Sequence, residues 1–194
     1  LLECWIESEN PSLRIGEIHY ARVTQIEELI NRVFFKLNNG SLVSARLNER
    51  NTNIGDLEIL TITAEERENK PAHAQRGFFL KGSSAIIIDN KDFLGISKKI
   101  ININERERIT SIAKDTGLYK AGAIIRSSAE SISDGELVKN FIELVDQWRE
   151  IKKINLEEKK EKKLFKGFSL EKQAQFLYPK AELIKDKFSI KFNE

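Results

Sequence analysis

The chain has 194 residues, of which 40% are hydrophobic and 32% charged, so it is long and apolar enough to bury one or two modest cores. Its 32 basic and 30 acidic residues leave a net charge of +2, which excludes nucleic-acid binding through bulk charge and leaves only local patches for that purpose. The single cysteine excludes an internal disulfide, and no apolar run reaches the roughly 18 residues of a membrane span, so we expect a cytoplasmic protein.

The first residues predict one short strand. Apolar side chains alternate over residues 2–7, and Pro11 ends the pattern shortly afterwards. The sequence begins at Leu1 without an initiator methionine and contains no methionine at all. We therefore expect a fragment or a trimmed form of a longer protein.

The stretch from Gly16 to about Gln75 alternates short β-strands with turn signals, which is typical of a small barrel. A hairpin turn is expected at Asn38-Asn39-Gly40. Closure of an OB-type barrel needs a fifth strand, which residues 74–80 or the rim would have to supply. The four strands that the pattern indicates directly cover residues 17–26, 32–37, 41–47 and 57–63.

A barrel of this kind binds single-stranded RNA by stacking bases on exposed aromatic rings, while basic side chains follow the backbone. Phe34 and Phe35 are the candidate rings. Because alternate strand residues face inward, either phenylalanine can instead belong to the core. Lys36, Arg46 and Arg22 are the candidates for phosphate contacts.

Residues 82–130 carry the strongest chemical signal in the sequence. An apolar strand over residues 82–89 and a basic turn at residues 96–99 precede a second apolar strand that ends in Arg126 and Ser127. A guanidinium offers a planar fork of donors that matches phosphate oxygens, and hydroxyls add further donors. The pattern favours phosphate capture at this strand end. The alternative is that Arg126 caps a segment or pairs with one of the nearby glutamates.

A charged helix is expected between these two strands. Asn104 with Glu107 forms a start that resembles a capping box, and Gly117 ends the helix. Arg106 and Arg108 are expected to face solvent. The buried stripe is formed by Ile109, Ile112 and Ala113.

A longer helix follows, opened by Ser133 with Glu136. Residues 152–163 are a run of lysine and glutamate, expected to continue this helix in solvent, with RNA binding by the run as the alternative. The apolar seam of the helix is core packing and consists of Leu137, Phe141, Leu144, Trp148 and Ile151.

These patterns, taken in order, resemble the RNase E/G family of bacterial endoribonucleases. That family shows a "LWIE"-like strand, a Gly-led strand followed by "RVT", an "ISRR"-like turn, an "IVRT"-like strand end and a "W-x-x-I" helix end. The matching segments are Glu3-Cys4-Trp5-Ile6-Glu7, Gly16-Glu17-Ile18-His19-Tyr20-Ala21-Arg22-Val23-Thr24, Ile96-Ser97-Lys98-Lys99, Ile124-Ile125-Arg126-Ser127 and Trp148-Arg149-Glu150-Ile151.

The resemblance implies an α+β fold, with a small OB-type β-barrel of the S1 kind, an α/β sensor subdomain and terminal segments of an RNase H-like subdomain. Residues 2–7 and 188–192 would then lie in one sheet. The implied domains are a first RNase H-like strand (1–15), the barrel (16–76), a 5′-sensor-like subdomain (77–151), and a charged helix extension with a partial RNase H-like return (152–194).

The resemblance also implies roles for particular residues. In the family, the arginine and hydroxyl of the "IVRT"-like strand end bind the terminal monophosphate of RNA, which assigns that role to Arg126 and Ser127. Gly82 and Ile86 stand where the first sensor strand touches the terminal nucleotide. Lys98-Lys99 replaces an arginine pair, which keeps the charge and loses the bidentate geometry.

In the barrel, Phe35 aligns with a family aromatic that stacks on RNA bases. Ala45 stands where the family has a second aromatic. Because a stacked base contributes about 1–3 kcal/mol, we expect weaker RNA binding through this barrel than through one with both rings.

Cleavage in the family needs two aspartates of a later DNase I-like subdomain that hold Mg²⁺, and a Cys-x-x-Cys beyond them binds zinc between protomers. The sequence ends before either. His19 and His73 have no ligand-spaced partners. We therefore expect no catalytic residue, metal ligand or cofactor in this chain, Mg²⁺ being needed only where a downstream catalytic subdomain exists. A homo-oligomer would form through the missing regions.

The sequence thus predicts an RNA-binding part of an RNase E/G-like endoribonuclease that recognises a 5′-monophosphate end and acts in RNA processing or decay. By itself, the chain is expected to bind single-stranded RNA without cutting it. The alternative is a non-catalytic OB-fold module that binds RNA or a protein and has lost cleavage. A third reading is a purely structural barrel, which predicts no salt-dependent RNA affinity.

Overall fold

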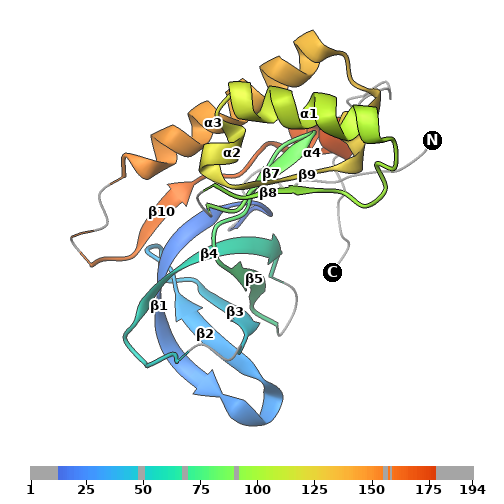
Figure 1. The fold of residues 1–194 in the computed structure, drawn as a ribbon. Helices are drawn as coiled ribbons and strands as arrows, with labels where there is room; N and C mark the ends of the chain where they lie inside the picture. The colour runs from blue at the N-terminus through green and yellow to red at the C-terminus, as the bar shows by residue number, and fades with distance from the viewer. Residues whose placement is uncertain are drawn as a thin grey trace, which may run out of the picture.

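The computed structural model of the protein describes residues 13–47, 51–66, 70–89, 92–154, 157 and 159–177. It consists of a β-barrel and an α/β unit that share one chain and lie side by side (Figure 1). The strands of the barrel are β1 (Ile18–Glu27), β2 (Arg32–Lys36), β3 (Leu42–Arg46), β4 (Leu57–Ala64) and β5 (Ala72–Arg76).

The barrel is closed by its fifth strand. β1 pairs with β2 on one edge and with β4 on the other, while β5 joins β3 in parallel and β4 in antiparallel register, so the ring has no open edge between these strands. This confirms the expected small OB-type barrel. The closing strand lies at residues 72–76, a little before the predicted segment 74–80.

Strand alternation decides what fills the barrel. On β2, Val33 and Phe35 point inward and are fully buried, whereas Arg32, Phe34 and Lys36 point outward. The turn after this strand uses Gly40 at φ 86°, the left-handed conformation that glycine adopts without a steric penalty. The inward residues form one barrel core that includes Val23, Val33, Phe35, Val43, Leu60 and Ile62.

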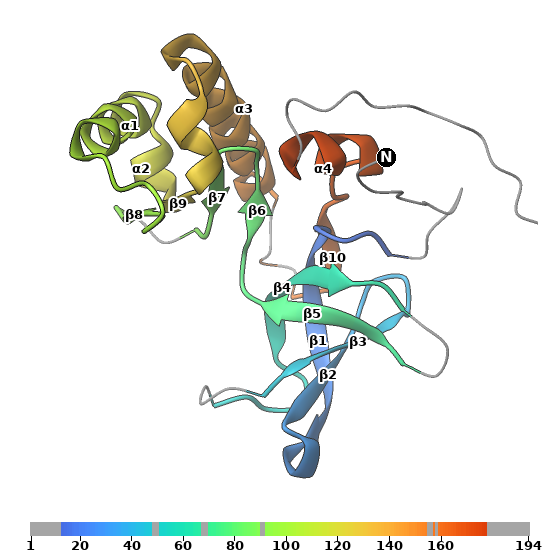
Figure 2. The same ribbon diagram turned by 90° about the vertical axis from the view of Figure 1, so that its right-hand side faces the viewer.

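The α/β unit is a four-stranded sheet covered on one face by helices. The strand order is β6-β7-β9-β8, with β8 parallel to β9 and the other pairs antiparallel. Figure 2 shows α1, α2 and α3 on one side of these strands and the barrel below them. The elements are β6 (Leu80–Lys81), β7 (Ala85–Ile87), β8 (Leu94–Ile96), β9 (Ala123–Ile125), α1 (Ile103–Asp115), α2 (Leu118–Ala121), α3 (Asp134–Lys152) and α4 (Leu170–Leu177).

The first helix begins two residues earlier than its sequence predicts. The side chain of Asn102, and not that of Asn104, accepts hydrogen bonds from the backbone amides of residues 104 and 105. Gly117 ends the segment with φ 81°, as expected. The predicted helix boundary therefore failed only at its start, where two asparagines compete for the same capping role.

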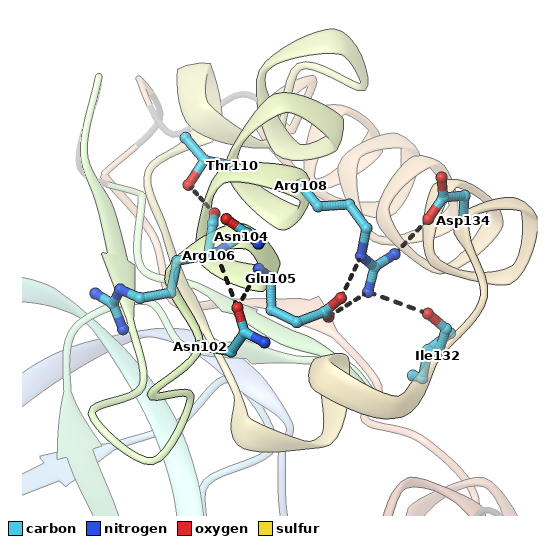
Figure 3. A network of polar contacts seen from close by, with 8 residues as sticks. All are labelled: Asn102, Asn104, Glu105, Arg106, Arg108, Thr110, Ile132 and Asp134. Atoms are coloured by element: carbon cyan, nitrogen blue, oxygen red, sulfur yellow. Dashed lines mark hydrogen bonds and ion pairs between the residues drawn. The ribbon is translucent and has the colours of Figure 1, made fainter.

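Arg108 does not face solvent as predicted. Its guanidinium donates to the carboxylates of Glu105 and Asp134 and to the Ile132 carbonyl, so it ties α1 to the start of α3 (Figure 3). The hydrogen bond to Glu105 outweighs burial and, with Asp134, raises the pKa of Arg108. Both carboxylates lie in the first turns of their helices, where negative charge is favourable.

The expected continuation of the long helix into residues 153–163 is wrong. α3 ends at Lys152, and the chain returns to the barrel as a strand, β10 (Lys162–Phe165), which pairs with β1. The lysine and glutamate run has no apolar stripe to hold a helix against the core, whereas Leu164 on β10 packs into the buried cluster of the α/β unit. The seam residues Leu137 and Phe141 are buried in that cluster as predicted.

The barrel and the α/β unit are joined by packing as well as by the chain. Ile18 of β1 lies in the same buried cluster as the sheet and helices of the α/β unit. The connection between β5 and β6 turns at Gly77, with φ 116°, and is held by Thr61 of β4, whose hydroxyl donates to the Gly77 carbonyl at 3.0 Å and accepts from the Phe79 amide at 3.1 Å. This packing fixes how the two units sit against each other.

The expected RNase H-like segments, residues 2–7 and 188–192, lie outside the described residues. Within the described part of the chain, no helix is both long and apolar enough to cross a membrane.

A buried carboxylate lies where β10 meets β1. Glu17 accepts a hydrogen bond from Lys163 Nζ at 2.9 Å and lies 2.7 Å from His19 Nε2. Burial alone would raise the pKa of Glu17, but the hydrogen bonds from His19 and Lys163 outweigh it and hold the pKa below its ordinary value of 4.5. Ionised Glu17 therefore stabilises the fold above that pH, and the contribution is lost as the pH falls through the lowered pKa.

We predict that Lys163→Met lowers the free energy of unfolding by about 1–2 kcal/mol near neutral pH, the lower part of the range for charged hydrogen bonds, because the lysine is partly exposed. The difference from the unsubstituted protein should shrink as Glu17 becomes protonated in acid. Denaturant unfolding across a pH series measures both effects. Lys166→Met, at an exposed lysine of the same segment, is the control, and a loss that does not change with pH would contradict the assignment.

Candidate nucleic-acid interface

Three chain segments meet at one end of the four-stranded sheet. β7 runs antiparallel to β9, so the turn at residues 82–84 before β7 lies beside Arg126, which follows β9. The Arg126 amide donates to the Ser84 carbonyl at 2.9 Å. β8 runs parallel to β9, and the Ser97 amide donates to the Ile125 carbonyl at 3.0 Å. The sheet thus gathers a serine turn, an arginine and the basic turn after β8 at the same edge.

Arg126 is fixed by main-chain carbonyls. Its Nη1 donates to the carbonyl oxygens of Gly82 at 2.8 Å and Ser83 at 3.1 Å. Among the described residues, no carboxylate pairs with this guanidinium, and Nε and Nη2 have no hydrogen-bond partner. Burial of the half-buried side chain lowers the pKa of Arg126 below its ordinary value, yet a guanidinium stays charged near neutral pH. The result is an oriented cation with donors left for an anion.

Four other arginines of the described chain pair with carboxylates. Arg22 pairs with Glu161, Arg76 with Glu58, Arg108 with Glu105 and Asp134, and Arg149 with Asp146. The alternative reading of Arg126 as a partner for a nearby glutamate therefore finds no support among the described residues.

The residues near Arg126 differ in their exposure and in their hydrogen bonds. Ser127 is exposed, while the Ser128 hydroxyl donates to the Ser83 carbonyl at 2.7 Å and so secures the turn. Gly82 is buried, and a Cβ at this position would come within 3.2 Å of the Leu144 side chain on α3. Gly82 therefore serves close packing and offers its carbonyl to Arg126, whereas Ser127 is exposed next to Arg126.

The basic turn after β8 is held by a second arginine. Arg106 does not face solvent as predicted, because its Nη1 donates to the carbonyls of Ser97 at 3.1 Å and Ile100 at 3.0 Å. Lys98 and Lys99, between these two carbonyls, are exposed. The turn therefore presents two cations at the sheet end that carries Arg126.

On the barrel, the structure corrects the choice of aromatic residue. Phe35 is 0% exposed and packs in the barrel core, so its ring cannot stack on a base. Phe34 faces outward on the same strand and is partly exposed. The sequence held a signal for this assignment, because Phe34 is in phase with the charged Arg32 and Lys36, while Phe35 is in phase with the apolar residues of the strand.

Of the three basic residues proposed for the barrel, one is bound within the protein and two are exposed. Arg22 is already bound, since it donates to Glu161 at 2.5 Å and to the carbonyls of Gly55 and Lys159 at 3.0 Å each. Lys36 on β2 and Arg46 on β3 are exposed, and β2 also carries Phe34. These two adjacent strands form the face that OB-type barrels use for oligonucleotides.

Comparison with known protein families decides the identity of the chain. The Ribonuclease E/G family matches residues 79–182, which is more than half of the sequence. The chain belongs to the ribonuclease E/G family. This confirms the resemblance and gives the protein a ribonuclease-family role with RNA as its ligand. The matched region of this ribonuclease E/G chain covers the whole sheet end around Arg126, whereas the barrel lies before it.

Magnesium-dependent cleavage requires carboxylates that gather around an ion. Within the described ranges, no group of three or more histidine, cysteine, aspartate or glutamate side chains could hold one.

The two adjacent phenylalanines should respond in opposite ways to substitution. Phe35→Ala should lower the free energy of unfolding by about 3–5 kcal/mol, because it leaves a cavity in the barrel core. Phe34→Ala should leave most of the stability and lower affinity for single-stranded RNA by about 5- to 150-fold, the loss of one stacked base. Thermal unfolding measures the stability of both variants, and fluorescence anisotropy with a 5′-hydroxyl oligonucleotide measures their affinity for RNA. Unchanged RNA affinity in Phe34→Ala would exclude this face.

Proposed function

We propose that this chain recognises the 5′-monophosphorylated end of single-stranded RNA, as the RNA-binding part of an endoribonuclease that acts in RNA processing or decay. The observation that carries the proposal is the state of Arg126. This half-buried cation is oriented by two carbonyls and has no carboxylate partner among the described residues. A terminal phosphate is the charge-assisted acceptor that such a guanidinium favours.

The surrounding groups support a doubly charged ligand. The phosphate would accept from the remaining donors of Arg126 and from the exposed Ser127 hydroxyl. Lys98 and Lys99 would add attraction to the phosphate charge without fixing its orientation. A 5′-hydroxyl end lacks this charge, so the same residues would gain little from it.

The barrel would hold the RNA downstream of its first nucleotide. Phe34 offers a ring for a base, and Lys36 and Arg46 flank it with positive charge on the same two strands. This face also favours the second candidate function, a non-catalytic OB-fold module that binds RNA whatever its 5′ end. The two functions differ in whether the terminal phosphate changes the affinity.

We predict that Arg126→Ala lowers affinity for a 5′-monophosphorylated oligonucleotide by roughly 10- to 150-fold, the equivalent of one charge-assisted hydrogen bond, with little change for the 5′-hydroxyl form. Fluorescence anisotropy with both forms of one RNA sequence measures the difference. Arg149→Ala removes the same charge from an exposed arginine of α3 and should affect neither RNA. Equal losses on both RNAs in Arg126→Ala would reject 5′-phosphate recognition and leave the second candidate.

A further inference from the structure

A pocket of about 340 Å³ lies beside the edge of the four-stranded sheet, between the end of β8 and the helix α1. Ile96 of β8 contributes an apolar side chain to it. The other lining residues are polar and form one stripe of α1, since residues three and four positions apart lie on the same face of a helix. These residues are Arg106, Glu107, Thr110, Ser111 and Lys114.

Arg106 is held in the same way as Arg126. In both residues Nη1 donates to two main-chain carbonyls, and no carboxylate among the described residues pairs with the guanidinium. Figure 3 shows the Arg106 guanidinium extending away from the ion pairs of Arg108. The carbonyls fix the position of the charge without neutralising it, so Nε and Nη2 of Arg106 keep their donors for an anion.

The other side chains of the pocket also favour a negatively charged ligand. Lys114 and Ser111 are exposed, and neither has a partner among the described residues. The Thr110 hydroxyl already donates to the Arg106 carbonyl at 2.6 Å, so it adds no donor. Glu107 is exposed and is the one carboxylate among the described lining residues. Two cations and one carboxylate leave the pocket with a net positive charge.

Ser97 connects this pocket to the strand end that carries Arg126. Its amide donates to the Ile125 carbonyl at 3.0 Å, and its carbonyl accepts from Arg106 Nη1 at 3.1 Å. The two guanidiniums therefore lie close to the same residue. An RNA held by its terminal phosphate at Arg126 would have to pass only the turn of Lys98 and Lys99 to bring a later phosphate to Arg106.

We propose that the pocket between β8 and α1 binds an internal phosphodiester of the RNA near its 5′ end, with Arg106, Lys114 and Ser111 as donors. The inference rests on the proposed function, because the terminal phosphate at Arg126 determines which linkages reach the pocket. A phosphodiester carries one negative charge and no base identity, so the pocket adds affinity without sequence preference.

The experiment compares two RNA probes with the full chain. Both are 5′-monophosphorylated oligonucleotides of one sequence, and in the second the linkages nearest the 5′ end are uncharged methylphosphonates. We expect Lys114→Gln to lower affinity for the unmodified RNA by about 2- to 5-fold, the effect of one exposed ion pair, and to leave the methylphosphonate RNA unchanged. The slope of log K against log salt should fall by about 0.7, the value for one phosphate of a single strand. Fluorescence anisotropy measures both quantities.

A second variant should act in the opposite direction. Glu107→Gln removes the carboxylate of the pocket and should raise affinity for the unmodified RNA by about 2- to 5-fold. Because Lys114 and Glu107 are both exposed, thermal unfolding of the two variants should stay close to that of the unsubstituted protein. Lys166→Gln, at an exposed lysine after β10, removes the same charge as Lys114→Gln and should change neither probe.

The outcomes separate this pocket from the terminal phosphate site. If the unsubstituted protein prefers the 5′-monophosphate over the 5′-hydroxyl but neither Lys114→Gln nor Glu107→Gln changes RNA affinity, the pocket is rejected and phosphate recognition stands. Equal losses on both probes in Lys114→Gln also reject it, as does binding of inorganic phosphate that depends on Lys114 without any change for RNA. If the unsubstituted protein does not distinguish the two 5′ ends, both proposals fall. A loss confined to the unmodified RNA supports the pocket.

Discussion

A guanidinium that gives hydrogen bonds to two main-chain carbonyls, and meets no carboxylate among the described residues, is fixed in position without being neutralised. Arg126 is in this state because β7 and β9 pair so that the Gly82 and Ser83 carbonyls face the strand end. The carbonyl dipoles offset part of the cost of burying the charge, but they carry no full negative charge. Under the proposed function, a phosphate would supply the negative charge that the carbonyls lack.

The topology of the sheet explains how residues from separate segments come to lie near Arg126. Parallel pairing of β8 with β9 brings the lysine turn to the same edge as Arg126, although the two are separated by a helix in sequence. Arg106 and Ser128 donate hydrogen bonds to main-chain carbonyls of the turns that flank Arg126. These two residues position the turns, while Ser127, Lys98 and Lys99 are exposed beside Arg126.

The strands could be predicted from the sequence because they depend on local patterns. Alternating apolar residues and the turn at Gly40 define the barrel strands, and the apolar run before Arg126 predicts its position at the end of a strand. What failed depends on tertiary partners. The capture of Arg22 by Glu161 comes from a segment far away in the sequence. The burial of Phe35 is different, because the alternation along β2 already indicated it.

The dependence on tertiary partners also explains why the lysine and glutamate run after α3 was wrongly predicted to be helical. Its charges are compatible with a helix, but Leu164, directly after it, is buried where the chain returns along β1 as β10. Local propensity gives no information on that return, because the pairing partner lies at the other end of the chain. The two asparagines at the start of α1, Asn102 and Asn104, show the problem at short range, since both are good caps and only the folded turn selects Asn102.

The α/β unit is attached to the barrel at both of its ends. The chain enters through the turn at Gly77, which Thr61 clamps from both sides, and it comes back through β10, which is bonded to β1. Two anchors with a shared apolar contact leave no simple hinge between the strand-end arginine and the outer face of β2 and β3. If RNA binds at both places, as proposed, the protein sets the distance between them. Only an RNA long enough to span that distance would then contact both, and a shorter fragment would contact one.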